Sequence, residues 1–190
     1  MNLRIIALGS AVVILGVALL GAMFTPAPPG PTAWDWLEDT YWFVPPSGLP
    51  NQGFTSTSGD VQVGLGQTVY HIESCRYGYF KGINRTQVVG GPLACQTLIG
   101  SVTPEGDVQL TFLWIDDNGV VTQRTDARGV MRRRQGEWMM ENQMTSGGGT
   151  SSTAFLTHWA YMKQTEPGDA SFDDLPLVHV SVPEFLAGCR

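Results

Sequence analysis

The sequence predicts an all-β fold, in which one transmembrane helix precedes a single antiparallel domain, an up-and-down β-barrel or a sandwich of eight to nine strands. Three observations support this prediction. Residues 107–114 alternate polar and apolar side chains, which is typical of a half-buried antiparallel strand. Turn sequences rich in Gly, Asp and Asn separate this stretch from others like it. After residue 24 no stretch keeps a 3.6-residue apolar period, so long helices are not expected there.

Further strands are expected on both sides of this stretch. They cover residues 67–73, 77–83, 86–89, 96–102, 120–124, 128–132, 137–144 and 154–163. Short helical turns are expected at 34–38 and 183–187. A meander of this many short strands tends to close into a barrel, because closure removes exposed strand edges. The barrel domain is therefore expected to span residues 34–164, followed by an extended C-terminal wrap over 165–190.

The N-terminal residues have the character of a membrane anchor. The twenty residues from Ile5 to Phe24 carry no charge, and a helix of that length matches a hydrocarbon core of about 30 Å. We expect a retained anchor over residues 1–24. A cleaved signal peptide is the alternative, although its apolar region is normally shorter and ends in a small-x-small motif. The Pro-rich residues 25–33 then form a short, stiff linker.

The charges around this apolar stretch predict its orientation. Arg4 precedes it and acidic residues follow the linker, so the positive-inside rule keeps the N-terminus in the cytoplasm. The predicted location is the inner (cell) membrane, with a single pass and the C-terminal domain in the periplasm or another extracytoplasmic compartment.

The composition excludes two classes of protein. With 43% hydrophobic residues and six Trp, the chain is not intrinsically disordered. Its formal net charge of −6 argues against nucleic acid as a partner, because binding to phosphates needs an excess of basic side chains.

One short segment resembles a known family. In Leu37–Phe43 an acidic turn leads into Trp42 at the start of the first expected strand. This resembles the opening of calycin barrels (lipocalins, avidins and their relatives), which place a Trp near the N-terminus to plug one end of the barrel. Thr40 stands where lipocalins usually carry Gly. The resemblance implies an up-and-down barrel and, as an alternative function, a tethered carrier that binds a small apolar ligand inside it. The residues expected to line such a cavity are Phe112, Trp114 and Trp138.

The three cysteines, Cys75, Cys95 and Cys189, all follow the apolar stretch and would lie in an oxidising compartment. One disulfide is expected, with one cysteine left over. A bond between Cys75 and Cys95 is favoured because it would join neighbouring strands. In the alternative pairings, Cys189 bonds to either of them and pins the C-terminal wrap to the barrel.

The sequence offers little catalytic chemistry. It contains no G-x-S-x-G, S-x-x-K or H-E-x-x-H motif, so we predict no catalytic residue, no metal and no cofactor, and a protein that is not an enzyme. His71 and Glu73, which share one face of an expected strand, form the alternative of a catalytic pair. His158 is expected to be a half-buried imidazole with hydrogen-bond partners.

The leading prediction is therefore a non-enzymatic, membrane-anchored accessory or assembly subunit. Its β-domain would pack on a larger inner-membrane complex, for example a respiratory or photosynthetic one, so its partners would be the membrane and integral membrane subunits. Aromatic side chains close to the linker and the one basic cluster supply the expected contacts, because such groups favour bilayer and protein interfaces. These residues are Trp34, Trp36, Arg132, Arg133 and Arg134.

Overall fold

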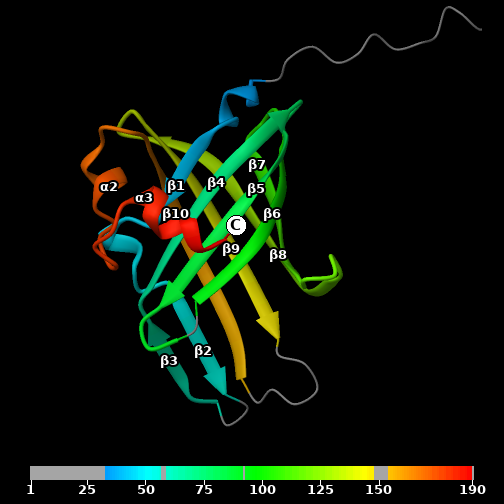
Figure 1. Cartoon of the computed structure of the whole chain (residues 1–190), viewed down its shortest axis with the longest axis vertical. Coiled ribbons are helices and arrows are strands. Elements are labelled where there is room, and N and C mark those ends of the chain that lie inside the picture. Colours follow the sequence, from blue (N-terminus) through cyan, green and yellow to red (C-terminus); the bar gives the residue numbers. More distant parts are fainter. Residues whose placement is uncertain (1–32, 57–58, 92, 148–153, 190) are drawn as a thin grey trace, which may run out of the picture. The chain divides into compact units, whose positions relative to one another are not determined.

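The computed structural model describes residues 33–189, with gaps at 57–58, 92 and 148–153 (Figure 1). The predicted anchor over 1–24, and the linker up to residue 32, lie outside the described residues. Within the described ranges, no helix has both the length and the apolar character needed to cross a membrane.

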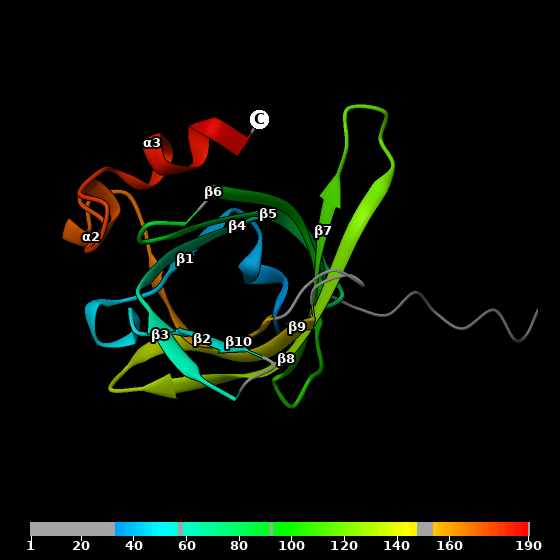
Figure 2. The same ribbon diagram turned by 90° about the horizontal axis from the view of Figure 1, so that it is seen from below.

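Ten antiparallel strands form one sheet, and eight of them close into a barrel (Figure 2). The strands are β1 (Thr40–Phe43), β2 (Gln52–Ser56), β3 (Val61–Gly64), β4 (Gly66–Arg76), β5 (Tyr79–Val88), β6 (Leu93–Val102), β7 (Asp107–Ile115), β8 (Val121–Arg134), β9 (Glu137–Gly147) and β10 (Ala154–Thr165). The barrel runs in the order β1-β4-β5-β6-β7-β8-β9-β10, and β10 pairs with β1 to close it. This confirms the predicted all-β fold with a closed antiparallel barrel.

The hairpin of β2 and β3 is an addition to this barrel. β10 pairs with β1 only through its last residues, and its first residues pair with β2 instead. β2 in turn pairs with β3, which ends the order of strands in the sheet. The hairpin therefore extends the wall at one end of the barrel, the lower end in Figure 1. The sequence did not predict these two strands, because both are short and contain glycine.

Apolar side chains fill the opposite end of the barrel. They come from the 3₁₀ turn η2 (Asp35–Leu37) and from the inward faces of the strands. Trp42 on β1 is fully buried there, and its indole N–H donates to the Thr40 hydroxyl over 2.9 Å. Trp34 is also buried, and its indole N–H donates to the carbonyl of Thr103 over 2.7 Å. A tryptophan thus lies in the apolar end of the barrel, where the calycin resemblance places one.

The C-terminal residues cover the outer face of β1 and β4. They form two short helices, α2 (Ala170–Asp173) and α3 (Val182–Leu186), and the turn η4 (Ala187–Cys189). The described wrap is therefore helical in part rather than extended throughout. A second apolar cluster joins it to the barrel; its buried members are Phe43, Val69, Phe172, Leu175, Val182, Phe185 and Leu186. The predicted helical turns at 34–38 and 183–187 are confirmed by η2 and α3.

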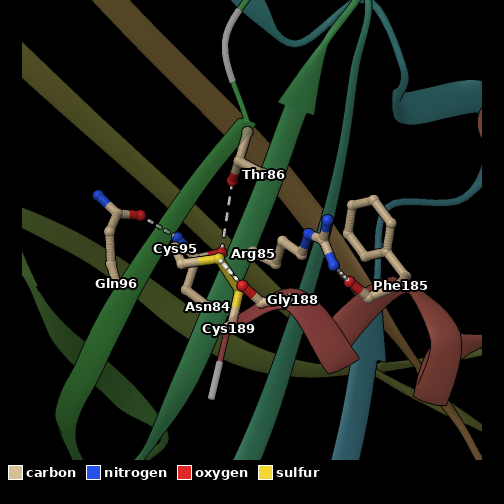
Figure 3. The surroundings of a disulfide bond; sticks show 8 residues. All are labelled: Asn84, Arg85, Thr86, Cys95, Gln96, Phe185, Gly188 and Cys189. Carbon is tan, nitrogen blue, oxygen red and sulfur yellow. Dashed lines mark hydrogen bonds between the residues drawn. A yellow bond between two sulfur atoms is a disulfide. The ribbon is translucent and has the colours of Figure 1, made fainter.

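The disulfide joins Cys95 on β6 to Cys189 in η4, with an S–S distance of 2.02 Å (Figure 3). The favoured pairing of Cys75 with Cys95 is therefore wrong. Cys75 is a free thiol that belongs to the apolar cluster inside the barrel. Cys95 faces the outside, because its neighbour Gln96 faces the interior and side chains alternate along a strand. Two side chains on opposite faces of one sheet cannot form a bond.

Arg85 forms a second link between the wrap and the barrel. It lies on the outer face of β5, where its guanidinium donates to the carbonyl of Phe185 and its Cζ atom lies 5.0 Å from the centre of the Phe185 ring (Figure 3). The disulfide and this contact hold α3 and η4 against β5 and β6.

Candidate functional site

A cavity of about 590 Å³ occupies the end of the barrel where the β2–β3 hairpin lies. Its volume is in the range of small-molecule sites, roughly 300–1,000 Å³. It is lined by Gln52, Gln62, Val63, Gly64, Thr86, Val88, Val89, Gly90, Gly91, Ala94, Gln96, Trp114, Thr125, Met144 and His158. The two ends of the barrel therefore differ: one is filled by its own apolar side chains, and the other is hollow and lined by both polar and apolar residues.

One side of the cavity wall is a hydrogen-bonded network between β4, β5 and β6. Asn84 donates its side-chain N–H to the side-chain carbonyl of Gln96, and the Thr86 hydroxyl donates to the side-chain oxygen Oδ1 of Asn84 over 3.4 Å. The hydroxyl oxygens of Thr68 and Thr86 lie 3.0 Å apart. These hydrogen bonds fix the orientation of the polar side chains on that side and offset the free-energy cost of burying them.

The polar atoms on the other side of the cavity have no such partners. The buried atoms Gln52 Nε2, Thr125 Oγ1 and both ring nitrogens of His158 have no hydrogen bond among the described residues. A buried polar atom without a partner costs about 1–3 kcal/mol, so folded proteins rarely leave one unpaired. Four such atoms on three residues that line one cavity are therefore better explained by a binding site than by a core.

Gln52 and His158 come from the neighbouring strands β2 and β10, and Thr125 comes from β8, with β9 between β8 and β10. In the sheet register His158 on β10 lies opposite Gln52 on β2 and opposite Met144 on β9. Met144 pairs in turn with Ala127 on β8, two residues from Thr125. Directly opposed residues of an antiparallel pair lie about 5 Å apart, so one small molecule can reach all three side chains.

Burial also decides the charge of His158. Desolvation lowers its pKa from 6.5 to about 4, because the cavity wall cannot solvate an imidazolium. At neutral pH the ring is therefore uncharged, with one nitrogen as a donor and the other as an acceptor. The expected half-buried imidazole with partners is corrected here, since His158 is only 2% exposed and both of its nitrogens are unpaired.

This pKa predicts a pH-dependent stability. The unfolded chain binds the proton more tightly than the folded one, so the stability contributed by neutral His158 is complete above pH 6.5 and is lost as the pH falls towards about 4. Between pH 7.5 and 4.5 the loss from this group is about 2–3 kcal/mol. Urea unfolding at the two pH values checks it: the free energy of unfolding should fall less in His158→Gln than in the parent protein. An equal fall in both proteins would refute this role of His158.

The residues predicted to line a cavity have different locations. Trp114 lines it, whereas Phe112 lies deeper in the core, where its ring centre is 5.7 Å from that of Tyr70. Trp138 lies at the opposite, apolar end, packed against Trp34 and Trp36 at ring-centre distances of 5.2 and 5.6 Å. Of the three, only Trp114 belongs to the cavity.

Of the predicted contact residues, Trp34, Trp36 and Arg133 meet around Trp138 at the apolar end of the barrel. Trp34 is 6% exposed and belongs to the core, whereas Trp36 is 37% exposed. Arg133 lies over the ring of Trp138 at 5.9 Å and donates to the carbonyl of Gly136 over 3.0 Å. Arg132 and Arg134 both form ion pairs with Glu141. The basic cluster is therefore tied to groups of its own domain.

His71 and Glu73 do not form a pair. His71 Nε2 lies 3.0 Å from a carboxylate oxygen of Asp39, and its ring stacks on Tyr41 with the ring centres 4.2 Å apart. A β-bulge follows between Ile72 and Ser74, and Glu73 is exposed. In the described ranges, no three His, Cys, Asp or Glu side chains group in a way that could hold a metal ion.

A second hollow, of about 700 Å³, lies on the outer face of β8, β9 and β10. The exposed Trp159 stacks beside Tyr161 there, with ring centres 6.3 Å apart. The Glu141 carboxylate in this hollow already pairs with arginines, and no buried polar atom of Trp159 or Tyr161 is unpaired. The cavity inside the barrel is therefore the stronger candidate.

Sequence reasoning missed the polar half of the barrel. The missed residues are Gln52, Gln96, Thr125 and His158. A signal was present in the alternation of β10, where His158 shares a face with Ala160 and Met162. When the inward positions of several strands become polar at the same end of a barrel, that pattern indicates a cavity lined by polar side chains.

Comparison of the chain with protein-family models, with curated proteins and with solved structures finds no match in any of the three. The function is therefore argued from the geometry of the cavity.

Proposed function

We propose that this protein binds and carries a small organic molecule in the hollow end of its barrel, without chemical conversion of that molecule. The observation that carries the proposal is the set of unpaired buried polar atoms on Gln52, Thr125 and His158 beside a ligand-sized cavity. A ligand that bonds to these atoms recovers the free energy that their burial costs.

The division of the barrel supports a binding role. The apolar end, with Trp42 and its neighbours, supplies the stability of the domain, so the hollow end is free to be shaped by a ligand. Trp114, Val63, Val88 and Met144 offer apolar contacts inside the cavity, and the amide, hydroxyl and imidazole groups can fix the orientation of a bound molecule.

A dye and a cavity-filling substitution test this function. Ala94 faces the cavity from β6, so Ala94→Phe places a ring inside it. We expect the full-length parent protein to bind the neutral dye Nile red at one site, with a blue shift of its emission, and Ala94→Phe to bind it at least tenfold more weakly. Fluorescence titration measures both affinities.

Leu93→Phe is the matched control. Leu93 is exposed on the same strand, so an added ring there leaves the cavity open and Nile red affinity unchanged. Equal affinity in Ala94→Phe and the parent protein would mean that the dye binds elsewhere, and the proposal would fail.

An accessory subunit is the second candidate function. Trp36, partly exposed beside Trp138 and Arg133, supports it, because all three lie at the apolar end of the barrel, where the described residues begin. Trp, Tyr and Arg are the residue types that dominate protein interfaces. Purification of the native protein in a mild detergent tests this candidate: integral membrane subunits should co-purify with the parent protein and be lost with Trp36→Ala. Recovery of the chain alone would contradict it.

A further inference from the structure

The charge of the cavity restricts the class of ligand. None of the described residues that line it is Asp, Glu, Lys or Arg. His158 is uncharged at neutral pH, so it does not supply a counter-charge either. Transfer of an ionised group from water into such a site is costly unless an opposite charge pairs with it. The wall therefore selects against carboxylates, phosphates and amines.

The unpaired atoms restrict the ligand further, because most of them are donors. The Gln52 amide nitrogen can only donate, the Thr125 hydroxyl can donate or accept, and neutral His158 has one N–H and one acceptor nitrogen. Three donors, on β2, β8 and β10, thus lack an acceptor among the described residues. A carbonyl oxygen has two lone pairs and can accept from two of these donors at once.

The remaining wall is suited to a compact apolar body. Trp114 contributes an indole ring, and Val63, Val88 and Met144 contribute aliphatic surface. Aromatic rings pack favourably against an indole in offset or edge-on arrangements. The volume of about 590 Å³ leaves room for a molecule of two to three fused rings.

We infer that the ligand is an uncharged carbonyl compound with an apolar, ring-sized body, whose carbonyl oxygen accepts hydrogen bonds from two of the donors on Gln52, Thr125 and His158. This inference rests on the proposed function and adds the chemical class of the molecule that is bound.

Three probes of one ring system test the inference: 2-acetylnaphthalene has a neutral carbonyl, 2-ethylnaphthalene has none, and 2-naphthoate has a charged carboxylate. Equilibrium dialysis against the full chain at pH 7.5 gives their affinities. We expect 2-acetylnaphthalene to bind about three- to tenfold more tightly than 2-ethylnaphthalene, the effect of one to two hydrogen bonds. The charged 2-naphthoate should bind most weakly of the three.

Two nearly isosteric variants locate the carbonyl. Thr125→Val and Gln52→Met each remove a donor that has no partner among the described residues, so both variants should fold as the parent protein does. Since two of the three donors must include Gln52 or Thr125, at least one variant should weaken 2-acetylnaphthalene by about three- to tenfold, and both should leave 2-ethylnaphthalene unchanged. Thr97→Val, on the outer face of β6, is the matched control and should change neither affinity.

The possible outcomes separate this inference from the proposed function. If 2-naphthoate binds tightest, or if the two neutral probes bind equally, the cavity still binds ligands but the assigned class is wrong. If the variants leave 2-acetylnaphthalene unaffected, the assigned donors are wrong. If no probe and no Nile red binds, both the inference and the proposed function fail.

Discussion

Replacement of Trp42 by Ala is expected to lower the free energy of unfolding by about 3–5 kcal/mol. Trp42 is fully buried in the apolar end of the barrel, and its indole N–H donates to Thr40. The substitution leaves a cavity that closed β-strands cannot collapse to fill, and it removes this hydrogen bond. Domains of this size are usually stable by only about 5–15 kcal/mol, so the loss is a large part of the total. Urea unfolding followed by circular dichroism measures it.

Trp159→Ala is the matched control for this prediction. Trp159 is 51% exposed on the outer face of β10, so its loss leaves no internal cavity and should cost less than about 1 kcal/mol. Equal losses in the two variants would show that the apolar end around Trp42 does not stabilise the barrel.

Reduction of the disulfide is expected to cost about 2–4 kcal/mol. Cys95 and Cys189 are 94 residues apart in the sequence, so their bond removes much of the freedom of the unfolded chain. It also holds α3 and η4 on the barrel, next to the contact of Arg85 with Phe185. Unfolding curves with and without a reductant measure the loss, and the double substitution Cys95→Ser/Cys189→Ser should reproduce it.

The third cysteine provides the control. Cys75→Ala removes a free thiol and leaves the disulfide intact, so the effect of the reductant should persist in this variant. The reductant should have no further effect on the double variant. Identical curves for the oxidised and the fully reduced parent protein would contradict a stabilising role of the bond.

The barrel could be predicted from the sequence because its strands are long and alternate regularly. Two strands were each predicted as two shorter ones: β5 covers most of 77–83 and 86–89, and β8 covers most of 120–124 and all of 128–132. In β5 the polar pair Asn84 and Arg85 interrupts the apolar pattern, because Asn84 faces the inside of the barrel and Arg85 faces the C-terminal wrap on the outside. Polar side chains on both faces of a strand look like a loop when only local sequence is available.

The cavity and the disulfide depend on tertiary structure that local patterns do not contain. The choice between Cys75 and Cys189 as the partner of Cys95 depends on the face of the sheet and on the path of the last 25 residues. The position of His158 opposite Gln52 in the sheet register depends on the β2–β3 hairpin, which the sequence did not predict. The calycin resemblance suggested a ligand cavity, and Trp114 is the one residue predicted from it that lines the cavity found here.

The indole N–H signals of the six Trp side chains test the central claim most directly. In a two-dimensional ¹⁵N spectrum of the full chain, titration with 2-acetylnaphthalene should shift the Trp114 signal, assigned with Trp114→Phe, because Trp114 lines the cavity. The signals of Trp42 in the apolar end and of Trp159 on the outer face should stay in place. A shift of Trp159 with no change at Trp114 would place the ligand outside the barrel and contradict the account.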